Sequence, residues 1–247
     1  MAYRCYVCNG PLSVDPLAGH NRWTEVCCGR HARDGTPRCR VCGYIAAADD
    51  VLYQRGTVTD AEDAMVQVDA AWECGPCSSR DVVLAQSDAV EFLREVCGLS
   101  FHADVGISFE FVSPRRMAAE VDPEGRGETL GYCRYHPRQR SCAVFVNSVQ
   151  TEAGMACTCA HELFHAWIRS SGHAAAFGGS SEAACELVAL ALALHLDDAR
   201  EIRAKKATLR SAGRAHADRA RRLIRAYATR SVLADAADGA FATAFGR

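Results

Sequence analysis

The chain has 247 residues, 14 of them cysteine, with 49% hydrophobic residues and a formal net charge of -2 at pH 7. This length suffices for one large domain or for a small and a medium one, and the hydrophobic content is that of a globular protein with a real core. The near-neutral charge gives no general electrostatic reason to expect binding to nucleic acid or to an anionic membrane.

The N-terminal segment and the cysteine content both bear on location. MAYRCYVCNGPL has neither the basic nor the apolar region of a secretion signal, and no run approaches the roughly 18 apolar residues of a membrane span. We therefore expect a cytoplasmic protein without a membrane partner. Thiols stay reduced in that compartment, so the cysteines indicate metal ligation before disulfides.

Four close pairs of Cys or His mark residues 1–80. Two residues separate the members of each pair, which lets a tight turn aim both ligands at one tetrahedral zinc ion. The pairs predict two structural zinc sites, which would supply folding energy to a region short of large apolar residues. The first site comprises Cys5, Cys8, Cys28 and His31, with His20 and Cys27 as alternatives for the last two, and the second comprises Cys39, Cys42, Cys74 and Cys77.

Two elements are expected next along the chain. Residues 49–71 predict a hairpin arm, with a half-exposed strand around Val66. The segment from Ser87 to Gly98 predicts a short amphipathic helix that is capped by Ser87 or Asp88 and closed by the glycine. The Cys pairs end before this helix, so we place the domain boundary along it or just before it.

Three strands are predicted before the central motif of the chain. They are ISFEFVS from Ile107, ETLGYCRYH from Glu128 and CAVFVNSV from Cys142, the last leading into a helix. Strands in this place fit the small sheet of zincin-type peptidases, whose edge strand can pair with an extended substrate peptide.

The central motif is HExxH, formed by His161, Glu162 and His165. On a helix, four residues make slightly more than one turn, so both imidazoles project from one face and can share a metal ion. In zinc hydrolases with this motif the glutamate takes a proton from the attacking water and passes it to the leaving amine. Accidental HExxH motifs usually lie on exposed polar helices, whereas this one lies among Phe164 and Trp167. We therefore predict a catalytic zinc ion with Glu162 as general base.

The third zinc ligand is expected from the next helix, SSEAACELVALALALHLDD, whose Ala and Leu content predicts burial. The three-histidine motif HExxHxxGxxH is excluded, since Ile168 and Ser171 occupy the required positions. We favour Glu182, because the start of the helix lies nearer the loop that returns from the metal. Glu186 is one turn later and is either the alternative ligand or a residue that orients a ligand.

Several further side chains have weaker assignments. The oxyanion of the transition state needs a donor, and the sequence does not select among Tyr132, Tyr135, His136, Arg169 and His173. The cysteines that follow the last pair are predicted to be small buried core residues: Cys97, Cys133, Cys142, Cys157, Cys159 and Cys185.

The C-terminal part is rich in Arg and Lys between residues 200 and 225. Acidic residues and alanines are interleaved with these cations and no aromatic platform accompanies them, so we predict a solvated helix face rather than a nucleic-acid contact. The last segment, SVLADAADGAFATAFGR, predicts one or two short helices.

Taken together, these segments resemble the plant LIM-domain peptidases that are activated by ubiquitin and limit organ growth, and their shorter bacterial relatives. The resemblance rests on AHELFHAWIRSSG followed by SEAACELVA, on ETLGYC and on HARDGTPRCRVC, and it extends from about Cys5 to His195. It implies His161, His165 and Glu182 as zinc ligands, Glu162 as general base, and protein substrates that are cleaved at few sites. No ubiquitin-interacting helix or further LIM domain is visible in the sequence.

The expected fold is α+β. The resemblance implies a LIM-like double-zinc module at residues 1–80, a connecting helix at 81–98 and a gluzincin-type peptidase domain at 99–247, with a small mixed or antiparallel sheet. The function expected is a zinc-dependent endopeptidase whose LIM-like module gives stability and binds substrate or a regulatory protein. The alternative is a non-catalytic zinc-stapled adaptor, which the presence of Glu162 with both histidines disfavours, because a scaffold needs no base.

Overall fold

The structure is a computed structural model. It describes the backbone of residues 52–54, 65–68, 71–74 and 231, and residues 81–99, 101, 104–112, 116–117, 119, 129–148, 150–228 and 232–246 with their side chains. Its Cα positions divide the chain into two compact units, Met1–Arg80 with Val149–Thr151, and Asp81–Ser148 with Glu152–Arg247. Most of the predicted structural zinc ligands lie outside the described residues: Cys5, Cys8, Cys28, His31, Cys39, Cys42 and Cys77.

Three short strands are described in the first unit. They are β1 (Leu52–Gln54), β2 (Met65–Val68) and β3 (Ala71–Cys74), in the order β1-β2-β3. The strand predicted around Val66 is confirmed. The predicted hairpin arm at residues 49–71 is wrong, because β1 pairs with β2 in parallel and a tight hairpin joins only antiparallel strands. The antiparallel pair is β2 with β3, and it ends at Cys74.

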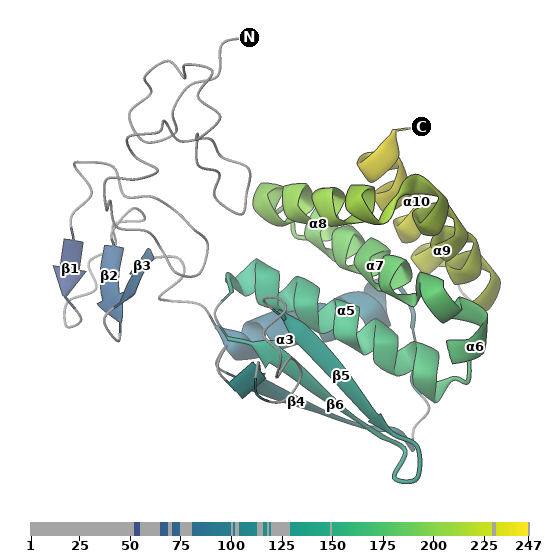
Figure 1. Ribbon diagram of the computed structural model, residues 1–247, viewed down its shortest axis with the longest axis horizontal. Coiled ribbons are helices and arrows are strands. Elements are labelled where there is room, and N and C mark those ends of the chain that lie inside the picture. The colour runs from purple at the N-terminus through teal and green to yellow at the C-terminus, as the bar shows by residue number, and fades with distance from the viewer. Residues whose placement is uncertain are drawn as a thin grey trace. The chain divides into compact units, whose positions relative to one another are not determined.

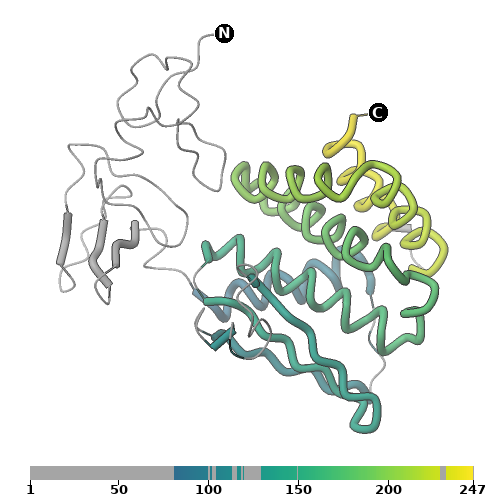
Figure 2. The backbone as a smooth tube through the Cα atoms, viewed as in Figure 1, coloured from purple at the N-terminus to yellow at the C-terminus, as the bar shows by residue number. Residues whose placement is uncertain are grey.

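A second sheet belongs to the second unit. Its strands are β4 (Gly106–Val112), β5 (Gly131–His136) and β6 (Ser141–Asn147), in the order β4-β6-β5. β4 is parallel to β6 and β5 is antiparallel to it, so the sheet is mixed and β5 forms one edge. Figure 2 traces β5 as it turns back into β6, which then leads into a long helix. The three predicted strands and the α+β class are confirmed.

The helix predicted from Ser87 begins earlier than expected. It comprises α3 (Val82–Glu91) and a π-helical turn, η1 (Phe92–Val96). Its N-cap is Asp81, whose Oδ1 accepts hydrogen bonds from the backbone N–H groups of Val83 at 2.8 Å and Leu84 at 3.2 Å. The caps proposed at Ser87 and Asp88 are therefore wrong. Val83 and Leu84 are exposed, so the first turn lacks the apolar pattern that marks a buried helix face.

The remaining helices form two layers over the sheet (Figure 1). The long helix α5 (Glu152–Ser170) contacts β5, β6 and α3 on one side and α7 on the other. The outer layer contains the rest: α6 (Ala174–Phe177), the 3₁₀ turn η2 (Gly178–Ser180), α7 (Ser181–His195), α8 (Ala199–Ala212), α9 (Arg214–Tyr227) and α10 (Ser231–Phe245).

The core lies between these layers. Every residue of α5 from Gly154 to Ile168 is buried, and α7 is buried from Ala183 to Ala193 except at Glu186. Contrary to the expectation from sequence, one segment, Ala174–His195, is long and apolar enough to cross a membrane by length and composition. However, 67% of its apolar window is buried inside the unit, and the central helix of a folded domain has the same composition. The segment is therefore weak evidence for a membrane span.

Candidate metal centre

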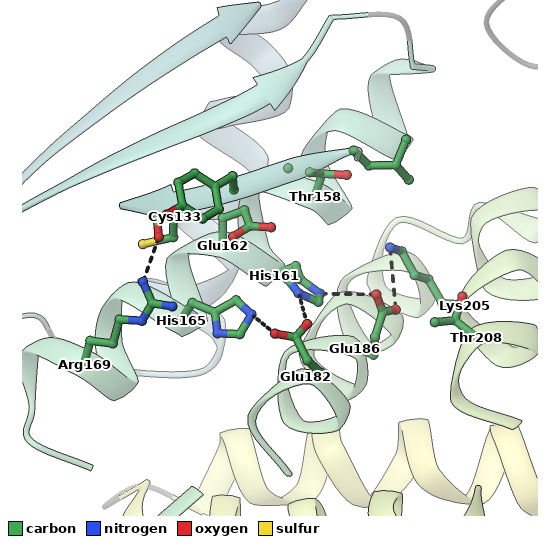
Figure 3. A pocket seen from close by; sticks show the side chains of 13 residues that line it. Cys133, Thr158, His161, Glu162, His165, Arg169, Glu182, Glu186, Lys205 and Thr208 are labelled. Carbon is green, nitrogen blue, oxygen red and sulfur yellow. Dashed lines mark hydrogen bonds and ion pairs between the residues drawn. The ribbon is translucent and has the colours of Figure 1, made fainter. Parts of the chain in front are cut away.

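The centre is built on the middle of α5. Helical spacing places His161 and His165 on one face, with their ring centroids 5.0 Å apart. Both rings and the side chain of Glu162 are buried, with 9%, 7% and 6% of each residue exposed. Figure 3 shows both imidazoles directed toward the N-terminal turns of α7. The HExxH residues therefore face a second helix that can supply another ligand.

Glu182 is the residue of α7 that meets both histidines. Its Oε2 lies 3.4 Å from Nε2 of His161, and its Oε1 lies 3.1 Å from Nε2 of His165. One carboxylate thus contacts the equivalent nitrogen of each ring. Two imidazole nitrogens and a carboxylate oxygen are the donor set expected around a divalent metal ion, so these side chains fit such an ion.

Glu186, one turn further along α7, reaches the other nitrogen of His161. Its Oε1 lies 3.2 Å from Nδ1 of that ring, and its Oε2 lies 3.6 Å from Nζ of Lys205 on α8. A carboxylate on Nδ1 holds the proton there and leaves Nε2 free as a ligand. Glu182, which the sequence favours as ligand, and Glu186, its alternative, therefore make different contacts.

Cys185 lies between these two glutamates in the sequence. Its sulfur and one nitrogen each of His161 and His165 lie within 4.8 Å of one another, so these three residues could hold a metal ion. A cysteine binds metal as the thiolate, and burial raises the pKa of this thiol well above its ordinary value. Glu182 contacts both rings with oxygens that are already ionised, so we regard it as the better third ligand.

Glu162 lies beside β5, in an environment that favours its neutral form. Burial raises the pKa of its carboxyl group, and the neighbouring His161 and His165 oppose that shift. The backbone of β5 comes very close here, since a Cβ at Gly131 would lie 2.8 Å from Oε1 of Glu162 and 2.5 Å from Cγ2 of Thr158. A carboxyl with a raised pKa suits proton transfer near neutral pH.

Electrostatics link the two histidines to the carboxylates around them. Burial would lower the pKa of His161, but hydrogen bonds to Glu182 and Glu186 outweigh it and raise the value to about 10. Burial would raise the pKa of Glu186, yet Lys205 and His161 lower it to about 2. Hydrogen bonds from both histidines lower the pKa of Glu182. Without a metal ion, the ring of His161 therefore carries a proton that an ion would displace.

A cavity of about 410 Å³ opens over the centre and is shared by β5, α5, α7 and α8. Of the candidate oxyanion donors, Tyr132 and Arg169 line it, and Nη1 of Arg169 donates to the carbonyl oxygen of Cys133 at 2.7 Å. His173 instead packs between the rings of Trp167 and Tyr227, with centroids 5.1 and 4.7 Å away. Tyr135 and His136 also lie outside the cavity lining.

Gly131, Thr158 and Lys205 belong to this site but were not predicted from the sequence. Gly131 and Thr158 line the cavity beside Glu162, and Lys205 lines it from α8. Lys205 falls in the segment predicted to be a solvated face, but it shares a buried stripe of α8 with Glu201 and Leu209. The spacing of four residues from Leu209 was the one signal that could have identified it.

The prediction that the remaining cysteines are buried core residues is confirmed. Cys97, Cys133, Cys142, Cys157, Cys159 and Cys185 are all buried and free. Burial raises the pKa of the Cys157 and Cys159 thiols, the latter to about 12, which is opposite to the shift of a reactive cysteine.

Comparison of the chain with protein-family models, with curated proteins and with solved structures found no match.

Proposed function

We propose that this protein is a zinc-dependent endopeptidase. One observation carries the proposal: the Glu182 carboxylate contacts Nε2 of both motif histidines, and Glu162 lies buried beside them on the same helix. Three protein ligands with an adjacent carboxyl group and an open cavity are typical of catalytic rather than structural zinc sites. A zinc ion bound there would supply Lewis acidity toward water and the substrate carbonyl.

The residues of the chain provide the rest of the chemistry. Glu162 accepts a proton from the attacking water at its carboxylate and then donates it to the leaving amine. Glu186 holds the proton on Nδ1 of His161, so that Nε2 is turned toward the metal. Arg169 and Tyr132 line the cavity as candidate donors toward the developing oxyanion.

The position of β5 at one end of the described sheet supports a polypeptide substrate. β5 lies at the edge of its sheet, and Gly131, Tyr132 and Cys133 of this strand line the cavity beside Glu162. An extended peptide can add to such an edge through main-chain hydrogen bonds. A strand beside the centre would bind a chain on both sides of the scissile bond, which favours cleavage within a protein.

The resemblance to LIM-domain peptidases extends the proposal to the whole chain. In it, residues 99–247 form a gluzincin-type domain that residues 81–98 connect to the Cys-rich residues 1–80. Those residues form a LIM-like module with two structural zinc ions that recruits substrate or a regulatory protein. We also propose a cytoplasmic location. The alternative, a non-catalytic adaptor, keeps the same zinc ions but uses neither Glu162 nor the cavity.

The test is proteolysis by a Glu162→Gln variant. Wild type and variant are incubated with a proteome-derived mixture of proteins, and new termini are identified by mass spectrometry. We expect zinc content to be unchanged and the rate of new termini to fall by about 10²–10⁴. The control, Glu152→Gln, makes the same change on α5 outside the cavity and should cleave as wild type does. Equal cleavage by wild type and Glu162→Gln would reject the assigned base, and no cleavage by either would favour the adaptor.

A further inference from the structure

Lys205 occupies an unusual position for a lysine. Only 7% of the residue is exposed, whereas Arg203 and Arg210 of the same helix are exposed and Lys206 is half-buried. A buried ammonium group is costly unless a carboxylate pairs with it. Its Nζ lies 3.6 Å from Oε2 of Glu186, and Figure 3 shows the side chain directed from α8 toward that carboxylate.

Glu186 contacts Lys205 with one carboxylate oxygen and His161 with the other. Oε1 faces Nδ1 of His161, whereas the buried Oε2 has no hydrogen-bond partner among the side chains and backbone that the structure describes. Lys205 is thus the ion-pair partner of this second oxygen. A carboxylate fixed at both oxygens cannot turn about its terminal bond, but one fixed only by the imidazole can turn away.

We propose that Lys205 is a positioning residue of the metal centre. By holding Glu186, it fixes the ring of His161 so that Nε2 faces Glu182 and the metal position. The chain of contacts runs from α8 through α7 to α5, and it ends on a nitrogen that does not bind the metal. This inference rests on the proposed function in one respect only: a metal ion must bind at HExxH.

A purely structural role for Lys205 predicts a different result. If the ammonium merely neutralised the buried Glu186 and Glu201, its loss would destabilise the metal-free protein without changing affinity for the metal. A positioning role predicts weaker metal binding, because an unfixed imidazole must be ordered each time an ion binds.

The experiment measures the affinity of the HExxH site in the full-length protein by titration with Co²⁺, whose visible spectrum reports its ligands. Spectra of a His161→Ala, His165→Ala double variant identify the signal of any other site. We expect Lys205→Met to weaken binding about tenfold, the lower end of the loss seen when an outer partner of a metal ligand is removed. Lys205→Arg should restore most of it, and Lys206→Met, the same change at a neighbouring lysine outside the cavity lining, should bind as wild type does.

A Glu186→Gln variant completes the test. If Lys205 acts through Glu186, adding Lys205→Met to Glu186→Gln should cause little further loss. Unchanged affinity in Lys205→Met, or fully additive losses, would overturn the proposal. Should Lys205→Met fail to fold, unchanged affinity in Glu186→Gln would overturn it as well. A wild-type spectrum identical to that of the double histidine variant would reject the proposed function itself, and that outcome is visible before any Lys205 variant is made.

Discussion

Glu182 and Glu186 stand one helical turn apart on α7 and reach the two different nitrogens of His161. Their surroundings match these contacts. The side chain of Glu182 is 74% exposed and projects into the cavity, whereas that of Glu186 is 16% exposed and lies against Lys205. A ligand that shares a metal with substrate must face the cavity, and a carboxylate that orients a ring is most effective when its own position is fixed.

The choice of third ligand is tested by changing Glu182 and Cys185 separately. We expect Glu182→Gln to lose the metal from the HExxH site, with an affinity at least about 100-fold weaker, because a neutral amide is a poor zinc ligand. Cys185→Ala should keep wild-type affinity, since its buried thiol stays protonated. The metal content of each variant after dialysis against a chelator measures these effects. Loss of the metal from Cys185→Ala together with its retention in Glu182→Gln would reverse the assignment.

Gly131 is predicted to be essential for a steric reason. A methyl group there would lie 2.5 Å from Cγ2 of Thr158 and 2.8 Å from Oε1 of Glu162, so the Gly131→Ala variant must displace the base or the strand. We expect proteolysis to fall by at least about tenfold with metal affinity near wild type, because the displaced group is the base and not a ligand.

The control for this change is Gly106→Ala, at the start of β4. There the new methyl group would meet only Cβ of Ser141 at 3.8 Å, an ordinary contact, so activity should be unchanged. Equal activity losses in the two variants would show that the effect at Gly131 comes from the sheet rather than from Glu162.

At the scale of elements, the sequence predicted what depends on local order. The spacing of HExxH places both histidines on one face of a helix, whatever packs around that helix. Glu182 was predicted as a ligand because it lies at the start of the next apolar helix. The strand of Val66 and the strand predicted from Ile107 followed from the alternation of apolar and polar residues. The register and pairing of those strands did not, because pairing partners are chosen by tertiary packing.

The features that the sequence did not predict depend in the same way on tertiary packing. Whether Lys205 is solvated depends on what packs against α8, and α7 with its glutamates covers that face. Likewise Gly131 matters because α5 brings Glu162 against β5, a contact between residues 31 positions apart in the chain. The start of α3 was missed because its first turn is exposed and carries no periodic signal. Local patterns identified the candidate metal ligands, whereas the residues that support them emerged only from the fold.

At the scale of the whole molecule, the metal-free protein should become less stable as the pH rises into the alkaline range. The carboxylates of Glu182 and Glu186 raise the pKa of His161 from its ordinary value of 6.5 to about 10. This charged pairing therefore stabilises the metal-free fold fully below pH 6.5, and the contribution is lost as pH rises through about 10. The two glutamates titrate at acidic pH and add no slope in this range.

The measurement is thermal unfolding of metal-free protein between pH 7 and pH 10. We expect the Tm of wild type to fall by roughly 5 °C more than that of His161→Gln, because each kcal/mol shifts the Tm of a domain of this size by about 2–4 °C. Metal-loaded protein should lose this difference, since the ion replaces the proton on the ring. Parallel Tm curves for the two metal-free proteins would contradict the charged state assigned to His161.

The number of zinc ions per chain tests the predicted metal sites of both units in one measurement. The Cys and His pairs of residues 1–80 predict two structural ions and HExxH predicts one more, so elemental analysis should give about three per chain. The His161→Ala, His165→Ala variant should keep about two, because tetrahedral thiolate sites do not depend on the HExxH residues. About two in both proteins would mean that HExxH holds no ion as purified, which would favour the adaptor. About one in wild type and none in the variant would leave the centre intact and remove the predicted structural sites, and with them the LIM-like module.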